Sequence, residues 1–289
     1  MTINIANSPT EKKTFQGHEL YIKRDDLLHR DFSGNKARKF YYFLKQDFPH
    51  IKKVVSYGSS QSNAMYSLSV LTKIRGWDFE YHIQHLSSYL QENPNGNFKY
   101  ALKNGMKVII DEKIPQKSNI ESEETLFIEE GGRDLFSEYG LKMLANEIVE
   151  WKEKNSIKEL NIFLPSGTGT TALFLQKNIA DSVYTVPCVG NRDYLKKQFF
   201  MLEENEQYHP TILEPSKKRH FGKLYKESYE IWLQLRQEID IEFDMLYDPH
   251  GWLTLLEHIK TFDKPLLYIH QGGLLGNESM VERYVWKYS

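Results

Sequence analysis

The sequence predicts an α/β fold with largely parallel sheets. Short apolar runs of strand length alternate with longer amphipathic stretches of helix length along the 289 residues, and this alternation is typical of parallel sheets covered by helices. Gly76 and Gly105 follow two predicted helices, and Asp193 precedes a third, as expected for helix ends and starts. A chain of this length can form two compact units that share an interface.

The predicted elements follow from this periodicity. The expected strands are residues 20–23, 54–57, 79–84, 107–110, 160–164, 184–189, 245–247 and 266–270. The expected helices are residues 64–75, 98–104, 141–154, 194–203, 226–238, 252–262 and 278–287. Residues 115–124 are the most polar and least periodic, which predicts a surface excursion and a possible domain boundary before Gly131 and Gly132.

Composition limits the possible functions. The net charge is −2 and charged residues are spread along the chain, so no positive electrostatic field favours binding to nucleic acid or to an anionic membrane. A small-molecule partner is therefore expected. Cys188 is a single cysteine, the start Met1-Thr2-Ile3-Asn4 has no basic and apolar leader pattern, and no apolar run approaches the roughly 20 residues of a membrane span. A cytoplasmic protein is expected. The ten histidines show no ligand spacing, so no catalytic metal is expected.

Lys36 is the first candidate functional residue. It follows Gly34 and Asn35, and residues 37–44 have helical character, which predicts a position at or near a helix N-terminus. There the helix dipole and the neighbouring cations Arg38 and Lys39 disfavour a charged ammonium and lower the lysine pKa. A lysine of that kind forms Schiff bases with aldehydes. The alternative is a solvated lysine at a basic helix start.

Residues 166–171 form the second candidate, a Ser-Gly-Thr-Gly-Thr-Thr run between a predicted strand and a helix at 172–175. Backbone N–H groups of such a run can point into one concavity and bind a phosphate. The run lacks the Gly-Lys-Ser/Thr ending of a nucleoside triphosphate loop and the glycine spacing of a dinucleotide site. A monoester phosphate fits better, and the alternative is an ordinary turn. A reactive lysine amine and a phosphate site would together bind a cofactor that carries both an aldehyde and a phosphate, and pyridoxal phosphate is such a cofactor.

Residues 56–63, Ser-Tyr-Gly-Ser-Ser-Gln-Ser-Asn, form a third candidate between a predicted strand and a helix. Hydroxyl and amide side chains in such a turn either cap the helix or contact a ligand. A cap uses one of them, and five consecutive polar residues exceed that need. The pattern therefore favours a turn that faces a ligand.

Taken together, these motifs resemble the family of 1-aminocyclopropane-1-carboxylate deaminase and D-cysteine desulfhydrase. Residues 21–27 (Tyr-Ile-Lys-Arg-Asp-Asp-Leu) and 33–39 (Ser-Gly-Asn-Lys-Ala-Arg-Lys) are similar to its N-terminal signature. Residues 58–63, 130–132 and 167–171 are similar to its later motifs, and residues 248–249 and 270–273 to reduced forms of its last two. The match spans nearly the whole chain in the same order. The family has the fold type II, tryptophan synthase β-like architecture of pyridoxal-phosphate enzymes.

The resemblance implies roles for matching residues. Lys36 would bind the cofactor aldehyde as a Schiff base and then act as the base at the substrate Cα. Asn63 would donate a hydrogen bond to the cofactor's phenolic oxygen, and Ser62 would lie close to the reacting carbon. The phosphate would be bound by Lys39, Gly167, Thr168, Gly169, Thr170 and Thr171. Ser60, Gln61 and Ser62 would bind the substrate, and Tyr225 is a candidate to supply a phenol to the same pocket.

The resemblance also implies an organisation. Two three-layer α/β units with mostly parallel sheets are expected, with the cofactor in the cleft between them. The larger would comprise residues 1–39 and 129–289, and the smaller residues 40–128. A homodimer acting on a small amino acid is expected.

The chain departs from the family in one late segment. Residues 248–254 read Asp-Pro-His-Gly-Trp-Leu-Thr, so the aromatic hydroxyl and the acidic or hydroxyl partner usual there are missing. Gln271 stands where the desulfhydrases have the threonine that faces the pyridine nitrogen, and an amide cannot stabilise a pyridinium as a carboxylate does. A pyridine ring without a carboxylate partner accepts electrons less well, which favours elimination from a β-substituted amino acid over opening of an unactivated cyclopropane ring. The alternatives are that Trp252 is a core residue, that Gln271 caps backbone groups, and that His270 is a buried histidine with satisfied hydrogen bonds.

Three hypotheses for the function follow. The first is a pyridoxal-phosphate lyase or deaminase that performs α,β-elimination on D-cysteine or a similar amino acid, with 1-aminocyclopropane-1-carboxylate deaminase activity as an alternative. The second is a cofactor-binding or amino-acid-sensing protein with little turnover, which the altered segment motivates. The third is a nucleotide-binding α/β protein that uses residues 167–171 alone.

Overall fold

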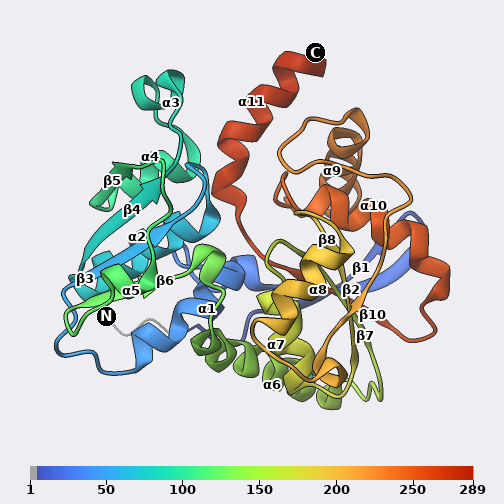
Figure 1. The fold of residues 1–289 in the computed structure, drawn as a ribbon. Coiled ribbons are helices and arrows are strands. Elements are labelled where there is room, and N and C mark those ends of the chain that lie inside the picture. The colour runs from blue at the N-terminus through green and yellow to red at the C-terminus, as the bar shows by residue number, and fades with distance from the viewer. Residues whose placement is uncertain (1–4, 289) are drawn as a thin grey trace.

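A computed structural model describes residues 5–288 of the chain. Residues 1–4, on which the expected lack of a leader depends, lie outside the described residues. Two sheets are covered by helices (Figure 1), which confirms the predicted α/β class. Within residues 5–288 no helix combines the length and apolar composition that crossing a membrane requires.

The larger sheet has six strands in the order β1-β2-β10-β7-β8-β9. Its strands are β1 (Thr10–Phe15), β2 (His18–Arg24), β7 (Asn161–Ser166), β8 (Ser182–Pro187), β9 (Thr211–Ile212) and β10 (Leu266–His270). Only β1 runs antiparallel to its neighbour among these paired strands. The carboxyl ends of the others therefore share one edge, where the Lys36 segment and the 166–171 run begin.

Helices cover both faces of this sheet. On one face α6 (Glu138–Lys154) and α7 (Thr170–Asn178) pack Leu144 and Phe174 with Ile162 and Ile269. On the other, α9 (Lys226–Ile239) and α10 (Asp248–His258) form a core with alternate strand residues such as Phe163. The remaining helices of this part are α1 (Gly34–Lys45), α8 (Arg192–Phe200) and α11 (Asn277–Tyr288). The result is a three-layer arrangement.

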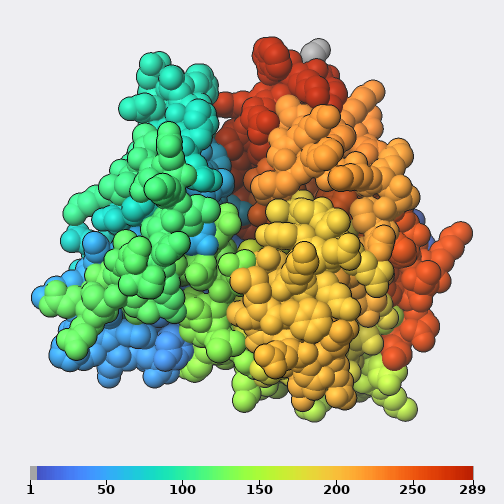
Figure 2. All heavy atoms as spheres, viewed as in Figure 1, coloured from blue at the N-terminus to red at the C-terminus, as the bar shows by residue number. Residues whose placement is uncertain are grey.

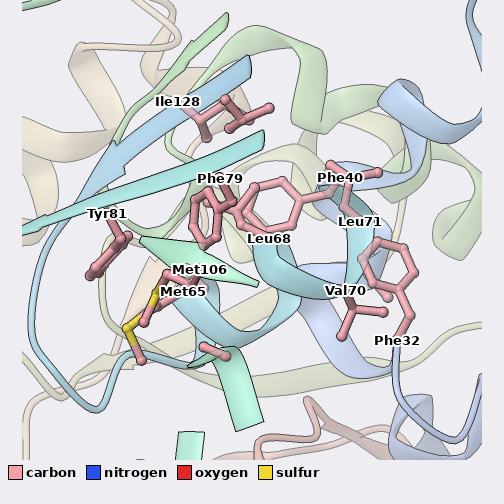
Figure 3. Close-up of a cluster of buried hydrophobic side chains, with 14 of the residues drawn as sticks. Phe32, Phe40, Met65, Leu68, Val70, Leu71, Phe79, Tyr81, Met106 and Ile128 are labelled. Carbon is pink, nitrogen blue, oxygen red and sulfur yellow. The ribbon is translucent and has the colours of Figure 1, made fainter. Parts of the chain in front are cut away.

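The smaller sheet has four parallel strands in the order β5-β4-β3-β6. Its strands are β3 (Lys53–Tyr57), β4 (Asp78–Ile83), β5 (Met106–Ile110) and β6 (Thr125–Ile128), and its helices are α2 (Asn63–Arg75), α3 (Ser88–Glu92), α4 (Gly96–Lys103) and α5 (Lys117–Ile120). Leu68 and Leu71 of α2 pack with Phe79 and with Phe40 of α1 (Figure 3). Helix α1 thus contributes to the core of the smaller sheet. The division at residues 40–128 stays a prediction.

Short 3-10 turns complete the chain, at Asp25–Leu27, Glu130–Gly132, Leu135–Ser137, Glu206–Tyr208, Ile259–Thr261 and Leu274–Gly276.

The predicted strand at 245–247 is wrong. Asp244 Oδ1 accepts hydrogen bonds from the backbone N–H groups of Leu246 (2.8 Å) and Tyr247 (2.7 Å), which folds this run into a turn. Helix α10 then begins at Asp248 with Pro249 in its first turn, earlier than the predicted start at 252. The apolar Met-Leu-Tyr run resembles a strand only when the local hydrogen bonds of Asp244 are ignored.

Strands β1, β6 and β9 were not predicted. Strand β1 is a polar edge strand joined to β2 by a tight turn in which Gln16 and Gly17 both have positive φ. An edge strand needs few apolar residues, so its pattern is weak. At α8 the N-cap is Asn191, which accepts from the Tyr194 N–H at 2.9 Å, and Asp193 lies inside the first turn.

Candidate active site

The start of helix α1 is fixed against the end of β10. The Asn35 N–H donates to the Gln271 carbonyl at 3.0 Å. Gly34 has φ +67°, and a Cβ there would lie 2.1 Å from the same carbonyl oxygen. Only glycine allows this approach. The segment that carries Lys36 is therefore anchored at the carboxyl edge of the larger sheet.

The opposite side of α1 is held by buried ion pairs. Arg38, which is fully buried, contacts Asp25 at 2.8 Å and Glu147 at 2.6 Å. Lys23 joins Glu147 at 2.8 Å. These pairs join β2, α1, α6 and the turn after β2, and they fix the rotation of α1. Lys36 and Lys39 leave the helix on a different side from Arg38, toward a cavity.

This cavity, of about 390 Å³, lies between the parts of the chain that form the two sheets. In Figure 2 the surface is hollowed between the green atoms on one side and the yellow and orange atoms on the other. The predicted site residues that line it are Lys36, Lys39, Gln61, Ser62, Asn63, Gly167, Thr168, Gly169, Thr170, Thr171 and Gln271. Their segments lie far apart in the sequence, and the fold brings them to one cavity.

Two predicted substrate residues do not line this cavity. Ser60 is absent from its wall, where its neighbours Ser59 and Gln61 are found. Tyr225 lines a smaller neighbouring cavity, and its hydroxyl accepts a hydrogen bond from the His220 N–H at 2.9 Å. The structure therefore does not bring Tyr225 to the main pocket, where it was expected to supply a phenol.

Lys36 has an unusual amine. Burial lowers its pKa from 10.5 to about 8, although nearby Glu130 opposes the shift. The expected lowering is present, but its main cause differs from the one inferred from the sequence. Arg38 is engaged by Asp25 and Glu147, and removal of the amine from water has the largest effect.

Lys39 is buried beside Lys36. Burial and the proximity of Lys36 lower the pKa of Lys39 well below its ordinary value. Its ammonium nitrogen donates to the Gly131 carbonyl at 3.0 Å. Two neighbouring buried amines on one helix form a site that favours an anionic ligand.

The 166–171 run has the form expected for an anion cradle. Gly169 adopts φ +73° and is the N-cap of α7, whose first residues Thr170 and Thr171 are buried at the cavity. The hydroxyls of Thr168 and Thr170 lie 3.1 Å apart. N–H groups of a helix's first turn have no intrahelical acceptor and attract anions. Together with the two lysine amines, this donor set fits an aldehyde that carries a phosphate.

The 61–63 turn presents one amide to the cavity in a fixed orientation. Asn63 Oδ1 accepts from Asn97 Nδ2 at 2.7 Å. The Asn63 nitrogen is a donor on the other side and lies beside the Asp244 carboxylate, where a hydrogen bond from Asn63 partly opposes the rise that burial causes in the pKa of Asp244. Ser62 Oγ caps α2 by accepting from the N–H groups of Ala64 and Met65. Gln61 Nε2 donates to Asn95 Oδ1 at 2.8 Å, which connects this turn to the start of α4.

Gln271 lies at the cavity with both ends of its amide engaged. Its nitrogen donates to the Pro165 carbonyl at 2.6 Å, and its oxygen accepts from Asn35 Nδ2 at 2.9 Å. Trp252 and His270 are core residues, as the alternatives for them predicted. The two ring nitrogens of His270 contact the Glu242 carbonyl and the Gly272 N–H.

Among the polar residues of the cavity wall that sequence reasoning did not assign are Glu130, Asp244 and Tyr247. Burial raises the pKa of Glu130, raises that of Asp244 to about 6, and raises that of Tyr247. Glu130 belongs to a motif that had no assigned role. The other two lie in the run mistaken for a strand, and the Asp-x-x-Tyr pattern of a side-chain-stabilised turn was the available signal.

No protein-family model matches the chain. Over 99% of its length it is 25% identical to a Thermotoga maritima protein, covered completely, named putative 1-aminocyclopropane-1-carboxylate deaminase. Over 98% of its length it is 21% identical to 80% of an Arabidopsis thaliana protein named bifunctional D-cysteine desulfhydrase/1-aminocyclopropane-1-carboxylate deaminase, mitochondrial.

Two solved structures show the same fold. A crystal structure described as an ACC deaminase homologue has a TM-score of 0.82 at 19% identity, covering 99% of this chain and 95% of its own. A crystal structure described as a T.th. threonine deaminase has a TM-score of 0.61 at 12% identity, covering 89% of this chain and 88% of its own. The resemblance inferred from the sequence motifs is confirmed. The chain is a distant relative of the 1-aminocyclopropane-1-carboxylate deaminase and D-cysteine desulfhydrase family and has the fold type II architecture of pyridoxal-phosphate enzymes.

Proposed function

We propose that this protein binds pyridoxal phosphate and catalyses α,β-elimination from a small β-substituted amino acid, as a D-cysteine desulfhydrase does, releasing a keto acid and ammonia. The observation that carries the proposal is the position of the Lys36 amine, with its pKa lowered to about 8, at the same cavity as the 167–171 cradle. The sequence motifs and the relatives support the same assignment.

Different residues of the cavity would bind different parts of the cofactor. Lys36 would bind its aldehyde carbon covalently, and Lys39 with Gly167–Thr171 would bind its phosphate. One N–H of the Asn63 amide would donate to its phenolic oxygen, because the contact of Asn97 with the Asn63 oxygen leaves the nitrogen end of the amide as the donor at the cavity. The bound cofactor supplies a conjugated ring that accepts the electron pair left when a substrate Cα proton departs.

Other roles of the cavity residues concern the substrate Cα proton and the orientation of the substrate. The Lys36 amine would take the proton from the substrate Cα. Ser62 and Gln61, which line the cavity, would orient the substrate. Tyr247 supplies a neutral phenol, because its raised pKa keeps it protonated near neutral pH. This phenol takes the place of the aromatic hydroxyl that is missing from residues 248–254.

One experiment tests the cofactor and the reaction separately. Purified protein is loaded with pyridoxal phosphate and reduced with borohydride, and peptide mass spectrometry is expected to find the cofactor on Lys36. Unreduced enzyme is then assayed with D- and L-cysteine for sulfide and pyruvate, and with 1-aminocyclopropane-1-carboxylate for 2-oxobutanoate. Failure to label Lys36 would remove the proposal and favour a nucleotide-binding role for residues 167–171.

A second candidate is a cofactor-binding protein with little turnover. It is favoured by helix α10, in which Gly251 and the buried Trp252 offer no polar side chain where the family has a tyrosine and its partner. A spectrum that shifts with amino acids while no product forms would support it. A third candidate function is 1-aminocyclopropane-1-carboxylate deaminase activity. The homodimer and the cytoplasmic location expected from the sequence stay predictions.

A further inference from the structure

Arg283 of helix α11 is a cation of the cavity wall that has only neutral partners. Among the described residues its guanidinium donates to the Gly222 carbonyl at 3.1 Å and lies 3.2 Å from Met280 Sδ, and no described ion pair includes it. A guanidinium has five N–H donors, so several remain for an anion. An exposed arginine without a carboxylate partner is ordinary by itself, so the position of Arg283 decides what it can do.

Helix α11 stands between the start of α4 and the segment before α9 (Figure 1), and it contacts both. A Cβ built on Gly96 would lie 3.1 Å from Gln61 Oε1 and 3.8 Å from Ser279 Cβ, so α11 passes next to Gln61. Ser279 and Arg283 are four residues apart and share one face of the helix. Both line the cavity. This face therefore runs outward from Gln61, which would orient the substrate, to Arg283.

The other anchor of Arg283 belongs to the opposite wall. The Gly222 carbonyl follows Phe221, whose ring lies 5.1 Å from the ring of Tyr247. Tyr247 in turn packs against Gly167 at the start of the phosphate cradle. Along this wall two aromatic side chains lie between the cradle and the Gly222 carbonyl. The cofactor phosphate already has the donors of the cradle, so the free donors of Arg283 remain for another anion.

The segment before α9 adds positive charge beside Arg283. Residues 217–226 read Lys-Lys-Arg-His-Phe-Gly-Lys-Leu-Tyr-Lys and contain no acidic residue, in a chain whose net charge is −2. Glu227 pairs with two of these cations, but Lys218 and Lys223 are exposed and belong to no described ion pair. Such a local excess of positive charge attracts anions. An amino acid with a neutral side chain has no net charge and gains little from it.

We propose that Arg283 makes the protein selective for small β-substituted amino acids whose substituent is anionic, by binding that anionic group. The inference rests on the proposed function and specifies its substrate class. A guanidinium can bind a carboxylate or a phosphate through two parallel N–H groups, and the contact with the Gly222 carbonyl fixes its orientation at the cavity. A neutral amide of the same shape offers one acceptor and no charge.

The test compares each acid with the amide of the same shape. Wild type, Arg283→Met and Lys287→Met are loaded with pyridoxal phosphate, and calorimetry measures the binding of both enantiomers of aspartate, asparagine, glutamate and glutamine. Wild type is expected to bind at least one acid about tenfold or more tightly than its amide. The ratio is expected to fall to near one in Arg283→Met and to persist in Lys287→Met. Lys287 is the matched control, because it donates to the Leu224 carbonyl at 3.1 Å from the same helix but does not line the cavity.

Two further measurements separate charge from the anchoring of residues 221–222. Arg283→Lys keeps the charge without the planar fork and is expected to give an intermediate ratio. High salt is expected to reduce the ratio in wild type, which requires no variant. Absence of acid binding to wild type, a wild-type ratio near one for both acids, or an unchanged ratio in Arg283→Met would overturn the proposal. Equal weakening of acids and amides in Arg283→Met would also overturn it, because Arg283 would then bind the common α-carboxylate or only anchor the segment.

Failure of the proposed function is detected separately. Borohydride trapping on Lys36 in wild type shows whether the cofactor is bound, and absence of trapping would contradict the proposed function. Calorimetry measures amino-acid binding with or without the cofactor. The ratio of acid to amide affinity therefore decides the role of Arg283 in either case.

Discussion

At the scale of single residues, the amine of Lys36 determines how fast the cofactor can attach. Its pKa of about 8 leaves about a tenth of the amine neutral at pH 7, far more than for an ordinary lysine. Only the neutral amine attacks an aldehyde, so the loading rate is expected to rise about tenfold per pH unit below pH 8 and to level off above it. Absorbance after mixing with pyridoxal phosphate between pH 6 and 10 measures this.

Lys36→Ala is the control for that experiment. It retains Lys39 and the phosphate cradle, so it is expected to bind the cofactor only weakly and to show no Schiff-base absorbance at any pH. A wild-type rate that continues to rise through pH 10 would show that the amine is not buried as described.

Tyr247 allows a second test at this scale. Tyr247→Phe removes the phenol while leaving the ring against Gly167, where the Tyr247 Cε1 atom lies 3.2 Å from a Cβ built on that glycine. Cofactor absorbance is expected to stay, and turnover of the best substrate to fall by about 10²-fold or more, as when a general acid is lost. Steady-state kinetics measure the effect. Tyr225→Phe is the comparison, and a loss as large there would contradict the assignment to Tyr247.

At the scale of secondary-structure elements, α1 depends on its buried ion pairs. Arg38→Met leaves Asp25 and Glu147 as buried carboxylates without their main cation. The free energy of unfolding is expected to fall by about 3–5 kcal/mol, which urea denaturation measures. Lys12→Met, which breaks the exposed pair with Glu19, is the control and is expected to change stability little. Equal effects of the two variants would show that the network does not hold α1.

Most helices and the central strands were predictable because their apolar periodicity reports directly which face is buried. Periodicity fails where side-chain hydrogen bonds or edges decide the structure, as at Asp244 and in β1. The sequence motifs predicted the site residues around Lys36, 61–63 and 167–171, but they did not predict other residues of the cavity wall such as Asp244. No local pattern tells that Asp244 and Asn63 meet, because the packing of α4, α10 and the turn after β10 brings them together.

At the scale of the whole molecule, a cofactor bound as proposed would contact segments from both sides of the cavity and stabilise the entire fold. Because only the native chain assembles the site, saturation at about 100 times the dissociation constant is expected to add about 2.7 kcal/mol to the free energy of unfolding. Thermal melting with and without pyridoxal phosphate measures this. Removal of the cofactor by a competing amine should reverse the gain, and an unchanged midpoint would contradict a shared site.

The position of β10 also bears on biosynthesis. This strand lies between β2 and β7 in the larger sheet but leaves the ribosome after both of them. Until it emerges, β2 and β7 have no common neighbour, and the Gln271 carbonyl that seats Asn35 does not yet exist. Until β10 is made, the segment that carries Lys36 therefore lacks its anchor at the edge of the larger sheet. A premature stop codon before residue 266 would leave two open strand edges that invite aggregation.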